Sequence, residues 1–253
     1  MLNRIIKIAQ ISDSHLLEDQ TENIHGINPY QRLSRIINHL KKNQYDLILF
    51  TGDVANNGDE KSYAQVLELT KEVKNKILII PGNHDDLDRL TKILSQSKMF
   101  IIWPQESIKV DDWYFVYLDT VVKGENHGYI TDDSIRTLTT NLKKTHDSNV
   151  CILMHHHPFD IGVPCVDKYK IHNSETIKNV LTKNVKLVVH GHVHNDYTIV
   201  KDIIYTSCPS TCFQFIKNDK VDNSIYGFKE YILSDDKISF NSTWFASHSL
   251  IKG

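Results

Sequence analysis

The sequence predicts an α/β protein in which two sheets are flanked by helices. Short aliphatic runs alternate with amphipathic helical patterns over residues 4–94, the order expected of a parallel sheet. Short aromatic and β-branched runs fill the middle and the end of the chain, which is typical of hairpins. No stretch is rich enough in Gly, Pro or Ser to act as a linker, so we expect one domain over residues 1–253.

The first part of the chain alternates between expected strands and expected helices. Pro29 suits the first turn of a helix and Asn28 suits its N-cap, while Asp59 can cap the next helix. The expected strands cover residues 4–11, 46–51 and 76–80, and the expected helices cover residues 29–43, 59–73 and 86–94.

The remainder of the chain is expected to form short strands and two helices. Asp111-Asp112 and Lys201-Asp202 are polar enough to turn hairpins, Thr131 can cap one helix, and Asn173 or Ser174 can cap the other. Residues 158–172 form a long loop, which often shapes a site. The expected strands cover residues 100–103, 107–110, 113–118, 150–154, 185–189, 197–200, 203–206, 225–233 and 237–240, and the expected helices cover residues 131–144 and 174–181.

Composition excludes several classes of protein. The formal net charge of −2 argues against a large nucleic-acid or membrane footprint. No stretch approaches the roughly 20 apolar residues that span a bilayer, and the first hydrophobic run is too short for a signal peptide, so we expect a cytoplasmic protein. The four cysteines lack Cys-x-x-Cys spacing, and we expect them to be reduced, with a Cys208–Cys212 disulfide as the alternative.

Five of the aliphatic runs end in Asp, Asn or His. In the clearest case, Pro81-Gly82 stops a buried strand and Asn83-His84-Asp85 follows it. Open α/β sheets place their chemistry at such carboxyl ends of strands. The other four runs lead to Asp13 and His15, to Asp53, to the triplet His155–His157, and to His192 and His194.

These strand ends supply seven nitrogen and oxygen donors without a thiolate. Asp13 and His15 are two residues apart, as are His192 and His194, so in an extended segment both members of a pair can face the same way. Imidazole mixed with carboxylate suits Mn, Fe, Zn or Co. Seven donors are too many for one ion, so we expect two ions bridged by one carboxylate. The expected donors are Asp13, His15, Asp53 (the natural bridge), Asn83, His155, His192 and His194.

Two metal ions about 3.5–4 Å apart form the arrangement that hydrolyses phosphate esters. They make hydroxide available near neutral pH, neutralise phosphoryl charge and orient the ester for in-line attack. His84 stands beside a donor and is not needed as one. As an imidazolium it could stabilise the transition state or protonate the leaving oxygen.

Each motif alone is weak evidence, because a Gly-Asp pair after a strand is more often a turn. Their combination in this order, all at strand ends, predicts a metal site. Within the triplet, counting back three residues from Pro158 favours His155 over His156 as the ligand. His190 is expected to be a packed strand residue.

Together the motifs resemble those of the calcineurin-like metallophosphoesterase superfamily over residues 13–194. They are Asp13-x-His15, Gly52-Asp53, Gly82-Asn83-His84-Asp85, His155 in its histidine run, and Gly191-His192-x-His194. Three further segments resemble the bacterial class III cyclic nucleotide phosphodiesterases, specifically the 3′,5′-cyclic-AMP branch. These segments are residues 26–29, 153–158 and 209–215.

The resemblance implies a four-layer αββα sandwich of two mixed sheets with a dinuclear metal site. One ion would bind Asp13, His15, Asp53 and His194, and the other would bind Asp53, Asn83, His155 and His192. His84 and Asp53 would be catalytic. The phosphate of a cyclic nucleotide would lie against His15, Asp53, Asn83, His84 and His194.

The implied activity is hydrolysis of 3′,5′-cyclic AMP to AMP by metal-bound hydroxide. Iron or manganese is expected, with zinc or cobalt as alternatives, and a homodimer is plausible by the same resemblance. The alternative is a promiscuous phosphodiesterase or phosphomonoesterase acting on 2′,3′-cyclic nucleotides or other esters. A nuclease is disfavoured because no basic tract is present, and a non-catalytic scaffold is disfavoured because all seven donors and His84 are present.

Overall fold

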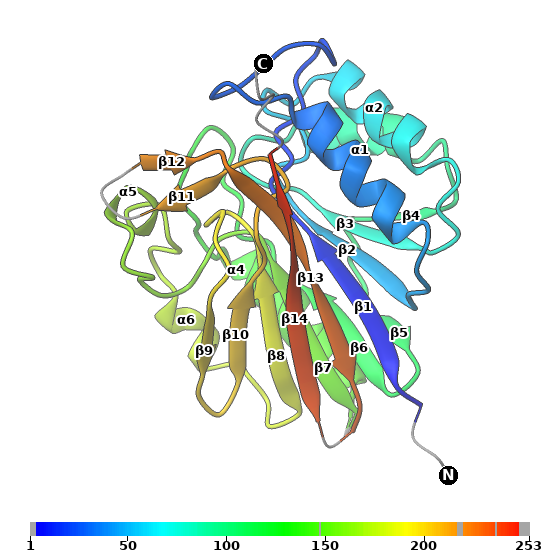
Figure 1. Cartoon of the computed structure of the whole chain (residues 1–253). Coiled ribbons are helices and arrows are strands. Elements are labelled where there is room, and N and C mark those ends of the chain that lie inside the picture. Colours follow the sequence, from blue (N-terminus) through cyan, green and yellow to red (C-terminus); the bar gives the residue numbers. More distant parts are fainter. Residues whose placement is uncertain (1–3, 147, 217–219, 236, 248–253) are drawn as a thin grey trace.

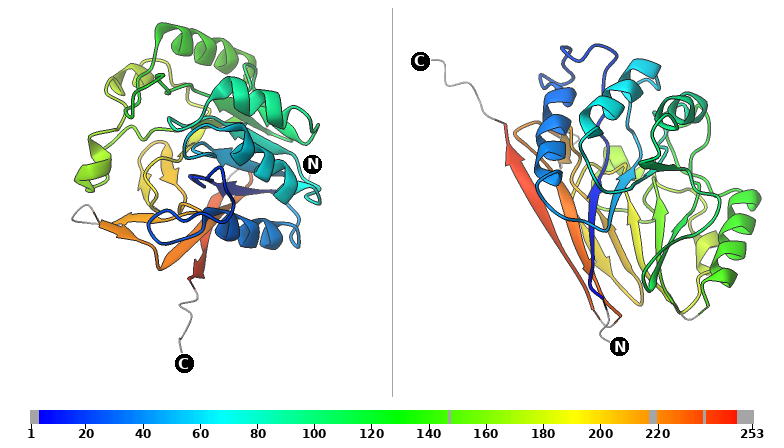
Figure 2. Two further views of the ribbon diagram at one scale, coloured as in Figure 1. Left: turned by 90° about the horizontal axis from the view of Figure 1, so that it is seen from above. Right: turned by 90° about the vertical axis from the view of Figure 1, so that its right-hand side faces the viewer.

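The computed structural model describes residues 4–146, 148–216, 220–235 and 237–247. Two six-stranded sheets pack face to face, and helices cover their outer faces (Figures 1 and 2). The expected four-layer sandwich of two mixed sheets is therefore confirmed. The helices are α1 (Pro29–Leu40), α2 (Glu60–Thr70), α3 (Leu87–Leu94), α4 (Asp132–Lys144), α5 (Pro164–Asp167) and α6 (Glu175–Lys178).

The first sheet has the strand order β14-β13-β1-β2-β3-β4. Its strands β1 to β4 are parallel, because α1, α2 and α3 return the chain between them, whereas β13 and β14 run antiparallel at one side. The strands are β1 (Ile6–Ile11), β2 (Leu47–Thr51), β3 (Ile77–Ile80), β4 (Phe100–Ile102), β13 (Ile225–Leu233) and β14 (Ile238–Ala246).

The second sheet has the strand order β5-β6-β7-β8-β10-β9. Its central strands β6, β7, β8 and β10 are parallel, and β5 and β9 are antiparallel edges. The strands are β5 (Ile108–Val110), β6 (Trp113–Tyr117), β7 (Asn149–Met154), β8 (Val185–His190), β9 (Thr198–Val200) and β10 (Ile204–Ser207). A separate ribbon joins β11 (Gln214–Ile216) and β12 (Lys220–Asp222).

Strand alternation explains the layers. In β2, Leu47 and Leu49 pack between the sheets, whereas Ile48 and Phe50 pack beneath the helices. Trp113 and Phe115 of β6 meet the first sheet from the opposite side. On the outer face of the second sheet, Leu138 and Leu142 of α4 belong to the same hydrophobic cluster as Val150 and Ile152 of β7. Both faces of the central strands are thus buried, which explains why their sequences are continuously apolar.

The predicted helix starts agree with the structure. The Asn28, Asp59 and Thr131 side chains accept hydrogen bonds from the backbone N–H three residues on, as N-cap residues do. The helix predicted to 181 is only four residues long. Of its two expected caps, Ser174 occupies the N-cap position without a side-chain hydrogen bond to the helix. Asn173 instead bonds the backbone N–H and carbonyl of Ile130 and ties the loop to the start of α4.

Several strands pair differently from the hairpins that we expected. Residues 100–102 pair in parallel with β3 at the edge of the first sheet. β10 forms the expected antiparallel hairpin with β9, but its other edge also pairs in parallel with β8. β14 extends to Ala246 and includes Trp244 and Phe245. The ribbon of β11 and β12 was not predicted.

The structure also bears on the Cys208–Cys212 disulfide and on membrane-spanning helices. Cys208 and Cys212 are buried thiols that form no disulfide, so the pairing considered for them is wrong. Within the described ranges, no helix is both long and apolar enough to cross a bilayer.

Candidate metal centre

The predicted donors lie at one edge of the sandwich because their strands are parallel. In the first sheet, β1, β2 and β3 end just before Asp13, Asp53 and Asn83. In the second sheet, β7 and β8 end just before His155 and His192. The carboxyl ends of both sets meet, so residues 179 positions apart in the chain share one site.

One group of donors joins both sheets. Asp13, His15, Asp53 and His194 are all buried, and a ligand atom from each lies within 4.8 Å of the others. Nε2 of His15 and Nε2 of His194 are 3.0 Å apart, and Nε2 of His194 is 3.5 Å from Oδ1 of Asp13. This group contains the four residues that the family resemblance implies for one ion.

The hydrogen bonds of these histidines fix which nitrogen is free. Nδ1 of His194 faces the carbonyl of Phe213 at 2.9 Å, and Nδ1 of His15 faces Oδ1 of Asn56 at 3.2 Å. Each Nδ1 must therefore carry the proton, because its partner oxygen can only accept. Two unprotonated Nε2 atoms then face each other beside two carboxylates. Such an arrangement is repulsive unless a cation lies among them, so the donor set fits a metal ion.

A second group of donors adjoins the first. Oδ1 of Asn83 is 3.1 Å from Nε2 of His155 and 3.2 Å from Nδ1 of His192. Nδ1 of His155 faces the carbonyl of Thr51 at 2.8 Å, which again leaves Nε2 as the donor. Nε2 of His192 is buried and has no hydrogen-bond partner among the described residues. These residues fit a second ion.

Asp53 lies between the two groups. Its Oδ2 is 3.7 Å from Nε2 of His15 and 3.4 Å from Nε2 of His155, while its Oδ1 accepts the backbone N–H of His84. A single carboxylate oxygen thus faces one imidazole from each group. This is the placement required of a bridging ligand, and Asp53 keeps that role as a prediction.

The histidines around these donors take different positions. His156 is also buried near His155 and His192, and its Nδ1 is 3.0 Å from Oγ1 of Thr120. In the part of the chain that the structure describes, its Nε2 has no hydrogen-bond partner. It therefore joins the second group in space, and the choice between His155 and His156 stays a prediction. His190 is buried against the hydroxyl of Tyr197, as a packed strand residue should be. His84 is less buried than the donors, and its ring is T-shaped to that of His15, with the two ring centroids 4.9 Å apart.

The backbone at the site is strained. Five of the seven predicted donors have a positive φ between 45° and 69°, a region that residues other than glycine rarely occupy. Such strain persists only where surrounding contacts enforce it, and it gathers at functional sites. The five residues are Asp13, His15, Asp53, His192 and His194.

Burial controls the charges in the site. Burial lowers the pKa of His15 to about 4 and that of His192 to about 3, so both imidazoles stay neutral and can donate a lone pair. Burial opposes the imidazolium of His155 too, but the Asp53 carboxylate outweighs it and raises the pKa of His155 to about 9. In the absence of a metal, a proton on His155 would take the cation's place beside Asp53.

We expect the metal-free protein to lose stability as the pH falls below 6.5. The pKa of each of six buried imidazoles lies below its ordinary value, chiefly because of burial, so the unfolded chain binds more protons there. Each net proton costs about 1.4 kcal/mol of unfolding free energy per pH unit. Asp13, Asp85 and His155 have raised pKa values and act in the opposite direction, but they are fewer. The six are His15, His156, His157, His190, His192 and His194.

Urea unfolding of chelator-treated protein at pH 7.5, 6.5 and 5.5 measures this dependence. A free energy of unfolding that is constant or rises toward pH 5.5 would contradict it.

Asp85 has a supporting role that the sequence did not reveal. Its carboxylate accepts the backbone N–H groups of Val54, Ala55 and Gly82 and the hydroxyl of Tyr63. It thereby fixes the loop after Asp53 to the loop before Asn83. The position of Asp85 in the sequence could have indicated this role, because a carboxylate that follows a tight turn next to buried strands needs several hydrogen-bond donors.

The loop after β10 also completes the site. Oγ of Ser210 donates to the carbonyl of Asp13 at 2.8 Å, and the Phe213 ring lies 4.6 Å from the His194 ring. Phe213 is buried, and it packs against His15, His194 and His25 beside the donors.

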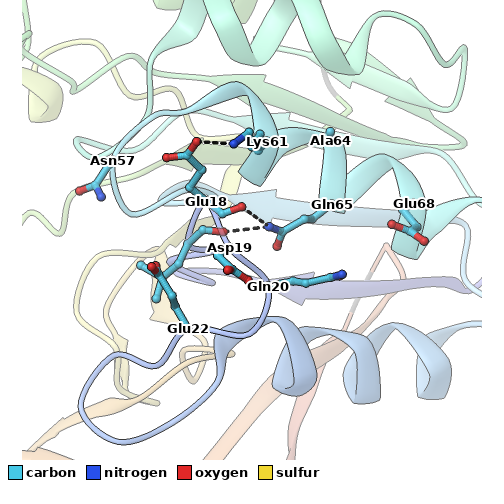
Figure 3. Close-up of a pocket in the computed structure, with 10 residues that line it drawn as sticks. Glu18, Asp19, Gln20, Glu22, Asn57, Lys61, Ala64, Gln65 and Glu68 are labelled. Carbon is cyan, nitrogen blue, oxygen red and sulfur yellow. Dashed lines mark hydrogen bonds and ion pairs between the residues drawn. The ribbon is translucent and has the colours of Figure 1, made fainter.

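Two cavities lie near this edge of the sheets. One, of about 390 Å³, is bordered by Asn83 and His84 and therefore opens directly beside the donors. The other, of about 560 Å³, lies against α2 and is lined by Glu18, Asp19, Glu22 and Glu68 (Figure 3). Lys61 pairs with Glu18 there, and the predicted donors are not among its lining residues. The first cavity is thus the one that can serve the metal centre.

The chain is similar in sequence and in fold to known phosphoesterases. A family model described as calcineurin-like phosphoesterase matches residues 6–196. A probable cyclic nucleotide phosphodiesterase of Coxiella burnetii is 35% identical, and the match covers 96% of this chain and 99% of that protein. The 3′,5′-cyclic adenosine monophosphate phosphodiesterase CpdA of Escherichia coli is 27% identical, with coverage of 83% and 78%. A solved dimetal phosphatase from Danio rerio shares the fold, with a TM-score of 0.70 at 11% identity and coverage of 95% and 98%.

Proposed function

Because this chain belongs to the calcineurin-like phosphoesterase family, we propose that it is a phosphodiesterase that hydrolyses 3′,5′-cyclic AMP to AMP. Its curated relatives are named cyclic nucleotide phosphodiesterases, and the two described above match along most of their length. The observation that carries the proposal is the position of Asp53, whose Oδ2 faces an imidazole from each donor group.

We propose that the seven predicted residues hold two metal ions. Asp13, His15 and His194 would bind one, Asn83, His155 and His192 would bind the other, and Asp53 would bridge them. Iron or manganese is our first expectation, with zinc or cobalt as alternatives, since imidazole and carboxylate accept all four. When bound, the ions would activate water and neutralise the phosphoryl charge.

The remaining chemistry belongs to side chains around the ions. Nδ1 of His84 lies 2.8 Å from the carbonyl of Asn56, which leaves Nε2 as the nitrogen available to a substrate. His84 also borders the cavity beside the donors. As an imidazolium, which also carries a proton on Nε2, it could stabilise negative charge on the phosphoryl oxygens or protonate the leaving 3′-oxygen. Asn83, which points its Oδ1 toward two imidazoles, keeps its amide N–H groups for a phosphoryl oxygen.

Replacing His84 with Ala should lower kcat for 3′,5′-cyclic AMP by about 100-fold, the usual contribution of a general acid. The bound metal should stay at the parent level, because His84 is outside both donor groups. Steady-state kinetics and metal analysis check both expectations. His172→Ala is the matched control: its imidazole is exposed and stacks on His127 at 4.0 Å, so kcat should match the parent. A His84→Ala enzyme with parental kcat would remove the catalytic role.

The test of the proposed function is turnover by chelator-stripped protein with manganese or iron restored. The substrates are 3′,5′-cyclic AMP, 2′,3′-cyclic AMP and bis-p-nitrophenyl phosphate. We expect the highest kcat/KM for 3′,5′-cyclic AMP. Slow turnover of it beside fast turnover of the other two would keep a diesterase and remove the cyclic-AMP assignment.

We also propose that the chain works as one domain in the cytoplasm. The donors come from both sheets, so neither sheet could form the site alone. A homodimer stays a prediction, which sedimentation at working concentration checks.

A further inference from the structure

The cavity beside the donors has a volume and a lining that suit the neutral part of a nucleotide. Its volume of about 390 Å³ is within the range of roughly 300–1,000 Å³ that is common for ligand sites. Asn83 and His84 border it on the metal side, and the start of α3 and residues 119–124 form other walls. Pro81, Leu87 and Val121 give it apolar surface.

Charge argues that the phosphate itself does not occupy this cavity. Asp86, Asp88 and Asp119 contribute carboxylates to its lining, whereas Lys123 contributes the one ammonium among its lining residues. A phosphate would be repelled there and attracted to the adjoining metal ions. The cavity would accept an uncharged group that offers N–H or O–H donors.

Asp119 has a carboxylate oxygen suited to such a donor. Its Oδ1 accepts the Tyr117 hydroxyl at 2.9 Å and the Val121 N–H at 3.0 Å, which hold the side chain in place. Within the part of the chain that the structure describes, no hydrogen bond reaches Oδ2. Asp119 is half-buried, and a hydrogen bond from a ligand to its charged Oδ2 would be of the stronger, charge-assisted kind.

We propose that this cavity is the nucleoside subsite and that Oδ2 of Asp119 accepts a hydrogen bond from the nucleoside. The donor is either the exocyclic amine of adenine or the ribose 2′-hydroxyl. The inference rests on the proposed cyclic-nucleotide activity. It assigns to Asp119 a preference for cyclic nucleotides over diesters that lack a nucleoside. The preceding strand β6 belongs to the sheet opposite that of Asn83, so this subsite is formed between the two sheets.

Asp119→Asn tests the assignment with little change of shape. The Asn carbonyl can still accept from Tyr117 and Val121, while its amide group replaces the accepting Oδ2. We expect kcat/KM for 3′,5′-cyclic AMP to fall about tenfold or more. Bis-p-nitrophenyl phosphate carries no N–H or O–H donor, so its loss should be at least about fivefold smaller. Asp133→Asn, an exposed carboxylate at the start of α4, is the matched control and should keep both values.

Two analogues identify the donor. Cyclic IMP lacks the amine and 2′-deoxy-cyclic AMP lacks the hydroxyl. In the parent enzyme one of them should lose about as much kcat/KM as the substitution does. The D119N enzyme should no longer discriminate that analogue from cyclic AMP.

Equal losses for both substrates in D119N, or no loss for cyclic AMP, would overturn the subsite. Parent enzyme that hydrolyses the nitrophenyl ester but not cyclic AMP would instead overturn the proposed function. If D119N proves unstable in a melting assay, the parent analogue series still decides. Parent kcat/KM values that are the same for cyclic AMP and both analogues would overturn the subsite.

Discussion

Asp53→Asn should lower kcat by at least about 1,000-fold, which corresponds to roughly 4 kcal/mol of transition-state stabilisation. The physical reason is the geometry of one oxygen. Oδ2 of Asp53 faces His15 and His155, while Oδ1 is held by the backbone N–H of His84 at 2.9 Å. In the variant, the Asn side-chain oxygen must take the position of Oδ1, because it has to accept the backbone N–H of His84. The amide N–H groups then point toward both imidazoles and exclude a bridged cation.

Metal analysis gives the second measurement. We expect fewer than two ions per chain in Asp53→Asn and two in the parent. Asp160→Asn is the matched control, because Asp160 is an exposed carboxylate that pairs with Lys170, and it should retain the parent's activity and metal content. A variant at position 53 that keeps two ions and full kcat would refute the bridging assignment.

Gly82→Ala should lower kcat by about 100-fold or more, the cost of a misplacement of roughly 1 Å at a catalytic group. An added Cβ at Gly82 would lie 2.1 Å from Oδ1 of Asp53, 2.4 Å from the Asp53 backbone nitrogen and 2.7 Å from Cε1 of His155. Real Cβ contacts are not that short, so Asp53 or His155 must move. The close approach of two strand ends is therefore what requires glycine here.

Gly162→Ala is the control that separates this steric effect from the backbone strain of replacing any glycine that has a positive φ. Gly162 has a φ of +84°, but an added Cβ would have no described neighbour within 4 Å. That variant should lose about 1–2 kcal/mol of stability from backbone strain and keep its metal content. Kinetics, metal analysis and urea unfolding on both variants check the pair. Gly82→Ala with parental kcat and two ions would contradict the packing argument.

Much of the site followed from local sequence. Short aliphatic runs bury strands, and the polar residues that follow them must leave the sheet at its carboxyl end. That rule placed Asp13, Asp53 and His192 at a common edge before any pairing was known. Helix starts at Asn28 and Asp59 were equally local, since a cap depends on residues three positions apart.

Other features depended on contacts between distant segments. The parallel pairing of β4 with β3, and that of β10 with β8, depend on crossovers between distant segments, which composition does not reveal. Asp85 was visible in the Gly-Asn-His-Asp motif, but the groups that it holds belong to three separate segments. The 119–124 wall of the cavity gave no signal in the sequence, because its neighbours on α3 come from the other sheet's layer.

The sequence by itself determined the layered α/β architecture, the kinds of donor and their strand-end positions, because burial and turn formation act over a few residues. Only the tertiary structure decided that Oδ2 of Asp53 lies between His15 and His155, that Asp85 fixes the loops around it, and that a cavity opens beside Asn83. The physical reason is that these positions follow from the packing of two sheets against each other, which joins residues more than a hundred positions apart.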